Sequence, residues 1–179
     1  EADALGMDAV DELTWSPDGR WLASRRRSGW IEVRSMPSLA FKRVARIVAP
    51  VPLSAAALPP PIVWSQDSRY LAVVGQRIDL EGPPPAATVH LFAIGPAGIS
   101  SPGAFGGAGV APRAWFANDG SALRFVEWTT KDADAPGAGG ALAAFTVDLA
   151  AAPIAAAPLG PLIPMQGPAD LPAEAFAFG

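Results

Sequence analysis

The chain has 179 residues, a formal net charge of −4 and a charged fraction of only 17%. This length suffices for one domain with a hydrophobic core, the acidic balance argues against binding to a phosphate backbone, and the absence of cysteine excludes disulfides and thiol chemistry. No apolar stretch reaches the roughly 18 uninterrupted residues of a membrane-spanning helix, and the 18 glycines and 20 prolines favour many short strands over long helices.

The first clear element is a hairpin over residues 13–24, in which two strand-like runs flank a hinge at residues 16–19. Pro17 presets the backbone φ of a type I turn, Asp18 can hydrogen-bond the local backbone, and Gly19 accepts the positive φ that closes the hairpin. The two flanking runs are therefore expected to pair as antiparallel strands.

This hairpin recurs further along the chain. The pattern of residues 15–23 returns at residues 64–72 and, more weakly, at residues 116–124, with starting points 49 and 52 residues apart. Each copy has an aromatic residue before the hinge, an aspartate in it and a leucine after it. Further strands are expected in each unit, a third at residues 31–34, 89–92 and 145–148, and a fourth at residues 42–48, 98–110 and 154–163. Four short strands in roughly 40 to 50 residues are typical of a β-propeller blade.

We therefore expect an all-β fold, a β-propeller segment of about three four-stranded antiparallel blades. Since rings of this kind typically have about four to eight blades, the segment is expected to belong to a larger or multi-chain ring. The expected units are an acidic lead-in (residues 1–12), blade 1 (13–48), a Pro- and Ala-rich linker (49–61), blade 2 (62–110), blade 3 (111–163) and a Pro-rich tail (164–179) that resembles the first strand of a fourth blade.

The hinge motif also resembles a known family. The aromatic-Ser-Pro-Asp-Gly-Arg-aromatic-Leu-Ala run of the first unit is similar to the WD40-like repeats of bacterial TolB-type propellers and of the propellers attached to prolyl peptidases. The resemblance covers residues from about 11 to 163 and departs from the pattern at Gln66, Ser68, Ala117 and Asn118. It implies a bacterial propeller repeat protein, but the motif specifies a turn and recurs in propellers with unrelated roles.

Three consecutive arginines end the second strand-like run. In an extended strand Arg25 and Arg27 share one face while Arg26 takes the other. Together with Trp30, Arg25 and Arg27 form a candidate surface for an anionic partner. The alternative is that these arginines pair with carboxylates at the blade edge, such as Glu32.

Two long loops follow the second strands of the second and third units, at residues 75–87 and 129–140. Equivalent loops of successive blades emerge on the same face, where repeat proteins commonly carry binding function. The alternative is that both loops are Pro- and Gly-rich decoration without order. The candidate partner-binding residues in the loops are Arg77, Asp79, Glu81, Lys131, Asp132 and Asp134.

His90 is the only histidine, and the sequence offers it no cysteine and no carboxylate pair at ligand spacing. We expect a structural or surface role for His90, and we expect no catalytic, metal-binding or cofactor-binding residue. The six tryptophans are expected to fill the spaces between blades, with a sugar-binding surface as the alternative.

These features predict a non-catalytic propeller scaffold for protein–protein interaction or assembly, without enzymatic activity. The expected partner is another protein or the remaining blades of the same propeller, rather than nucleic acid or a small molecule. One alternative is the part of a larger hydrolase, such as a prolyl-peptidase-like enzyme, that controls substrate access. Its chemistry would lie outside this chain, which lacks a Gly-x-Ser-x-Gly elbow. The other is a propeller that binds carbohydrate in its channel. The compartment stays open, with a periplasmic or extracellular location favoured over a cytoplasmic one.

Overall fold

A computed structural model of the chain describes residues 8–48, 62–78, 88–106, 110–130, 140–161 and 163–165. These residues form thirteen β-strands and no helix. The described part of the chain thus contains no helix that is long and apolar enough to cross a membrane.

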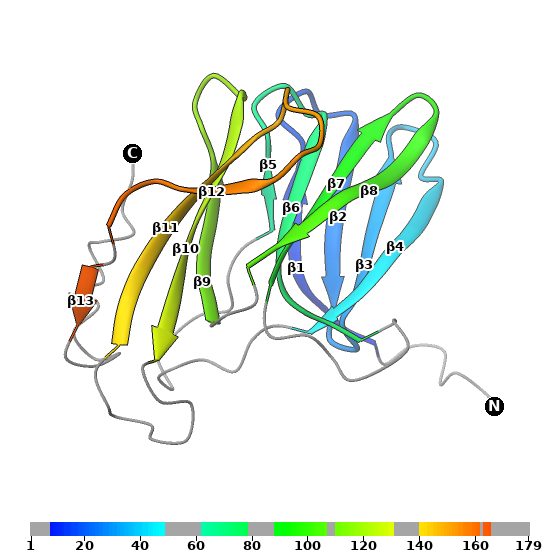
Figure 1. Cartoon of the computed structure of the whole chain (residues 1–179). Helices are drawn as coiled ribbons and strands as arrows, with labels where there is room; N and C mark the ends of the chain where they lie inside the picture. Colours follow the sequence, from blue (N-terminus) through cyan, green and yellow to red (C-terminus); the bar gives the residue numbers. More distant parts are fainter. Residues whose placement is uncertain are drawn as a thin grey trace.

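The strands form an eight-stranded and a five-stranded antiparallel sheet, and the larger one bends into two parts, so that there are three units in chain order, which we call blades 1, 2 and 3 (Figure 1). Blade 1 contains β1 (Val10–Trp15), β2 (Trp21–Arg26), β3 (Trp30–Ser35) and β4 (Phe41–Val48). Blade 2 contains β5 (Val63–Trp64), β6 (Tyr70–Arg77), β7 (Thr88–Gly95) and β8 (Gly98–Phe105). Blade 3 contains β9 (Val110–Phe116), β10 (Ala122–Thr130), β11 (Gly140–Asp148) and β12 (Ala156–Pro158), and the short β13 (Ile163–Met165) also pairs with β11. The predicted all-β fold of about three four-stranded blades is confirmed.

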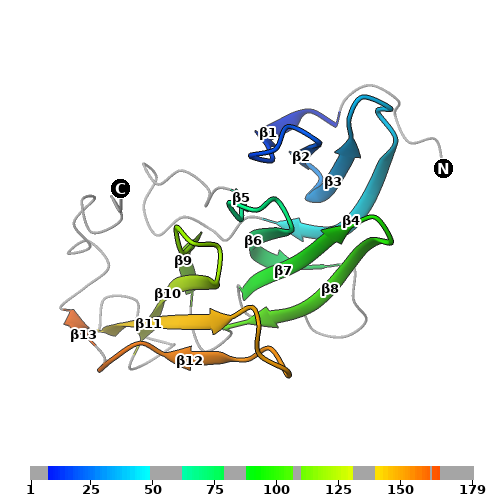
Figure 2. The same cartoon turned by 90° about the horizontal axis from the view of Figure 1, so that it is seen from above.

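The three blades are arranged as a fan. Seen from above, β1, β5 and β9 lie along its inner side, and β4, β8 and β12 lie along its outer side (Figure 2). Blades 1 and 2 are also joined at one point, where Ile47 and Val48 of β4 pair with the end of β6. Consecutive blades therefore lie next to each other in the order of the sequence.

The three hinges have the same cross-strand pairing and the same backbone hydrogen bond. Trp15 pairs across the hairpin with Leu22, Trp64 with Leu71, and Phe116 with Leu123. In each hinge the residue after the aromatic donates its amide to the carbonyl five residues on, over 2.8–2.9 Å. The aromatic residues therefore occupy the same place in each blade, as the repeat predicts. All three hinges lie at the same end of the fan (Figure 1).

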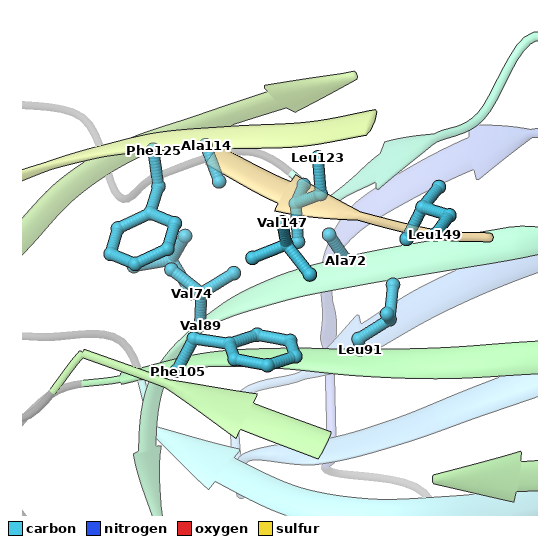
Figure 3. Close-up of a cluster of buried hydrophobic side chains, with 10 residues drawn as sticks. All are labelled: Ala72, Val74, Val89, Leu91, Phe105, Ala114, Leu123, Phe125, Val147 and Leu149. Atoms are coloured by element: carbon cyan, nitrogen blue, oxygen red, sulfur yellow. The ribbon is translucent and has the colours of Figure 1, made fainter. Parts of the chain in front are cut away.

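The hydrophobic core lies between the blades, because a sheet buries one set of alternate residues on each face. In β6, Leu71 and Val73 pack against blade 1, whereas Ala72 and Val74 pack against blade 3. Figure 3 shows the cluster between blades 2 and 3, which also contains the ring of Phe125. Blade 2 is thus covered on both faces, which explains its continuous apolar strands.

The tryptophans only partly follow the expectation that they fill the spaces between blades. Trp21 and Trp64 pack against the cluster between blades 1 and 2. Trp15 occupies the place of Trp64 in the preceding unit, yet its side chain is 54% exposed. The expectation is wrong for Trp15 in this chain because no described blade lies against its face of blade 1.

Candidate functional site

The candidate site lies on the face of blade 1 that points away from blade 2, which we call the open face. Cross-strand pairing determines its residues, because directly opposed residues in a sheet share a face. Trp15 pairs with Leu22, Leu22 with Arg34, and Arg34 with Phe41. The same reasoning places Leu13, Ser24, Glu32 and Arg43 on this face.

Glu32 is at the centre of the open face and is 2% exposed. Its Oε2 atom accepts hydrogen bonds from Arg26 Nε at 3.2 Å, from Arg26 Nη2 at 3.0 Å and from Arg34 Nη2 at 3.3 Å. Its Oε1 atom accepts a hydrogen bond from Arg43 Nε at 3.4 Å. One carboxylate therefore holds three guanidinium groups, and we call these four residues the arginine cluster.

Two guanidinium groups of the arginine cluster are also held by aromatic rings. The guanidinium carbon of Arg34 lies 4.8 Å from the centre of the Phe41 ring, and that of Arg43 lies 5.2 Å from the centre of the Trp30 ring. Such cation–π contacts limit how far a flexible arginine side chain can move. Arg34 and Arg43 are therefore fixed both by Glu32 and by a ring.

The charges of the arginine cluster are unequal, since three arginines surround one glutamate. Burial raises the pKa of Glu32, but its hydrogen bonds with Arg26 and Arg43 and the charge of Arg34 outweigh this effect and lower the pKa below its usual value. Glu32 is therefore ionised at neutral pH, and the four residues of the cluster carry a net charge of about +2, which the nearby carboxylate of Asp8 partly offsets. This part of the open face is suited to contact with an anionic group.

The structure separates the three consecutive arginines. Arg25 is 4% exposed, faces blade 2 and lies 3.8 Å from the carboxylate of Glu12. Arg27 is exposed, and its Nε atom lies 3.4 Å from Asp11 Oδ1. Arg26 rather than Arg25 or Arg27 is the partner of Glu32. Because Arg25 is buried, it does not form a surface with Arg27.

Trp30, the third member of the predicted surface for an anionic partner, is half-buried next to Arg43. Arg77 is half-buried at the end of β6, opposite Ile47. The other predicted loop residues lie outside the described residues, namely Asp79, Glu81, Lys131, Asp132 and Asp134. The linker at residues 49–61 lies outside them as well.

Sequence reasoning missed Glu32 as the centre of the site. Glu32 and Arg34 could have been recognised as two charged residues on one face of a strand. Arg43 could not, because the ladder between β3 and β4 shifts register between Ile31 and Glu32. This irregularity places Arg43 opposite Glu32.

His90 lies inside the fan, where it is 2% exposed and its Nε2 atom is 3.2 Å from the carbonyl oxygen of Gly75. Among the described residues, no group of three or more histidine, cysteine, aspartate or glutamate side chains could hold a metal ion. The His90 side chain is buried and lies next to the backbone of β6.

The sequence matches no known protein family and no curated protein. Solved structures do match. One is a candidate 6-phosphogluconolactonase from Bacteroides uniformis, with 18% identity, a TM-score of 0.52 and coverage of 93% of this chain and 42% of that protein. Another is dipeptidyl peptidase 4 from Porphyromonas gingivalis, with 17% identity, a TM-score of 0.55 and coverage of 82% of this chain and 25% of that protein. The chain thus spans less than half the length of either protein, and the likeness shows the β-propeller fold.

The comparison corrects the functional prediction. The expectation of a non-catalytic scaffold and of no enzymatic activity is contradicted, because the solved structures that share this fold include proteins named as a lactonase and a peptidase. A second candidate 6-phosphogluconolactonase, from Bacteroides fragilis, matches with a TM-score of 0.53, 16% identity and coverage of 89% of this chain and 40% of that protein. The fold therefore occurs in hydrolases.

Proposed function

We propose that this chain is part of the propeller of a larger hydrolase, in which the propeller controls access of the substrate to the catalytic site. The observation that carries the proposal is the similarity of three consecutive blades, over 82% of the chain, to a quarter of a peptidase. Fold alone does not fix a function, so the proposal needs a direct test of activity.

The hinge motif supports a peptidase as the kind of hydrolase. Residues 15–23 resemble the WD40-like repeats of TolB-type propellers and of propellers attached to prolyl peptidases. In such an enzyme the nucleophile belongs to a separate domain, which agrees with the lack of a Gly-x-Ser-x-Gly elbow in this sequence. The role of the blades is then to restrict which substrates reach that domain.

A lactonase is the second candidate, and a different observation favours it. The two candidate 6-phosphogluconolactonases match a larger share of this chain, 93% and 89%, than the peptidase does. In this case the reaction would take place on the propeller.

The test uses the natural polypeptide in which this chain occurs. Its hydrolysis of a chromogenic Gly-Pro anilide and of 6-phosphogluconolactone is measured side by side. Hydrolysis of the anilide supports the peptidase proposal. Hydrolysis of the lactone alone would replace it with the second candidate, and hydrolysis of neither would overturn the assignment to these two classes.

A further inference from the structure

We propose that the open face of blade 1 binds a further propeller blade of the natural polypeptide, and that this blade places a carboxylate against Arg34 and Arg43. The inference rests on one part of the proposed function, namely that the chain belongs to a larger propeller. It does not depend on the reaction that the protein catalyses.

The open face of blade 1 can be compared with the equivalent face of blade 2, which packs against blade 1. Ile62 and Leu71 lie 49 residues after Leu13 and Leu22, so they hold the equivalent positions in the second unit. Ile62 is 3% exposed and Leu71 is 0% exposed, and both are buried between blades 1 and 2. Leu13, by contrast, is 60% exposed. The open face thus carries apolar side chains at the positions that blade 2 uses to pack against blade 1.

A hydrogen bond made by Trp64 indicates what its counterpart Trp15 can do. The indole Nε1 of Trp64 donates to the carbonyl oxygen of Thr14 in β1 over 3.3 Å, so it joins the inner strand of blade 2 to that of blade 1. Trp15 has the same place in blade 1 as Trp64 in blade 2. Its indole is therefore positioned to donate to the innermost strand of a blade on the open face.

The equivalence ends at the arginine cluster, and this difference identifies the chemistry of the partner. By register, Arg34 occupies the place of Phe92, which is 2% exposed, and Glu32 occupies the place of His90. A blade that covered the cluster would bury more positive than negative charge, even with the exposed carboxylate of Asp8 near Arg26 and Arg43, and this is costly unless the covering face supplies negative charge. Arg34 and Arg43 keep partly exposed side chains that a carboxylate can reach.

A second copy of this chain fits the open face less well. Its free sheet face would be the outer face of blade 3, on which Arg124 is exposed and pairs across the sheet with Trp115 and Thr146. Stacking that face on the arginine cluster would bring Arg124 towards Arg34 and Arg43, and the exposed Asp148, which lies on the same face opposite Ala122, would offset only part of this repulsion. The favoured occupant is a different blade of the same polypeptide, because the chain spans less than half the length of the solved propeller proteins that it resembles.

Hydroxyl-radical footprinting of the natural polypeptide tests the contact. The oxidation rates of Trp15 and Trp64 are compared in the natural protein and in the 179-residue chain alone. We expect Trp15 to be oxidised several-fold faster in the chain alone and as slowly as Trp64 in the natural protein. Equal, fast oxidation of Trp15 in both would overturn the proposal. So would a light-scattering mass of a dimer for the chain alone together with protection of Trp15.

A pair of leucine substitutions provides a matched control. Leu13 and Leu39 are 60% and 57% exposed in this chain, but only Leu13 lies on the open face. In the natural protein, Leu13→Asp is expected to lower the Tm by about 5 °C or more, whereas Leu39→Asp changes it little. Equal effects of the two would contradict a covered open face. Because neither measurement uses activity, protection of Trp15 in a protein that hydrolyses no tested substrate would support this inference and refute only the proposed function.

Discussion

The backbone amide of Asp18 donates a hydrogen bond to the hydroxyl of Ser68 over 3.0 Å, and this contact joins the hinge of blade 1 to the hinge of blade 2. The two residues are 50 positions apart in the sequence. Ser68 has a φ of 61° and takes the place that Gly19 has in the first hinge. The departure from glycine at this position therefore supplies a contact between blades.

Substitutions at Ser68 separate the contact from the backbone conformation. Ser68→Ala removes the hydroxyl and keeps a side chain at positive φ, so it is expected to lower the free energy of unfolding by about 1 kcal/mol. Ser68→Gly also removes the hydroxyl but relieves about 1 kcal/mol of left-handed strain, so its effect should be close to zero. Urea unfolding of both variants checks this order. A Gly variant that is less stable than the Ala variant would contradict it.

Gly75 is expected to tolerate no side chain. Its φ is 156°, and a Cβ atom there would overlap the carbonyl of Val48 and come within 2.5 Å of Ile47 Cγ2 at the junction of blades 1 and 2. Gly75→Ala should therefore lower the free energy of unfolding by about 3 kcal/mol. Gly95→Ala is the control, because no atom lies within 4 Å of its added Cβ. Thermal unfolding in which the two variants behave alike would show that the junction is arranged differently.

Glu32 is expected to be the most sensitive residue of the arginine cluster. Glu32→Gln removes the negative charge that holds Arg26, Arg34 and Arg43, so it should lower the free energy of unfolding by about 3 kcal/mol. Arg43→Met removes only the most exposed of the three arginines and should cost less than about 1 kcal/mol. Chemical denaturation of both variants measures the difference. A Glu32→Gln variant as stable as the original chain would mean that the cluster is not formed.

The hinge aspartates predict a loss of stability in acid. Asp18, Asp67 and Asp119 each accept a hydrogen bond from the amide two residues on, over 3.0–3.1 Å. Burial raises the pKa of Asp67, but the hydrogen bonds from Ser65 and Arg69 lower it by more than burial raises it. The net shift of the pKa is therefore downward from 3.8. A serine hydroxyl and a backbone amide lower the pKa of Asp18, and the amide and hydroxyl of Ser121 lower that of Asp119.

A lowered pKa in the folded state means that each group contributes stability above its unfolded pKa and loses it as the pH falls through the folded value. The free energy of unfolding should therefore decrease below about pH 4 through these groups. Asp67→Asn removes one of them, so this variant should lose less stability between pH 7 and pH 3 than the original chain does. Urea unfolding across this range provides the measurement, and an equal or larger loss in the variant would contradict the shift.

The sequence was sufficient for the blades because their hinges are local. The hinge of residues 16–19 combines a proline, an aspartate and a glycine whose conformational preferences act within four residues. The expected third strands at residues 89–92 and 145–148 place Thr146 at the position of His90, but cross-strand pairing places Phe145 there, so this alignment is wrong by one residue. No comparable local signal precedes β11, so only the pairing with β10 fixes its register.

The candidate site was less accessible to sequence reasoning because it depends on contacts between strands. The three arginines at positions 25–27 were visible as a group, but they separate onto different partners in the folded sheet. Arg43 joins Glu32 only through the register of β3 and β4. Charge in the sequence therefore indicated the region, and pairing in three dimensions determined which residues meet.

The order of the three hinges along the rim is the central feature of this fold, and a cross-link tests it most directly. A Cβ atom on Gly120 would lie 3.9 Å from Asp67 Cγ, so the side chains at the two positions are neighbours, and cysteines there can be tested for a disulfide, which needs Cβ atoms about 3.5–4.5 Å apart. The chain contains no cysteine of its own, so the double variant Asp67→Cys/Gly120→Cys can be oxidised without competition. We predict that it forms an intramolecular disulfide readily, whereas Asp18→Cys/Gly120→Cys, whose hinges are separated by blade 2, does not. Rapid disulfide formation in the second variant and none in the first would contradict the stacking of the blades in chain order.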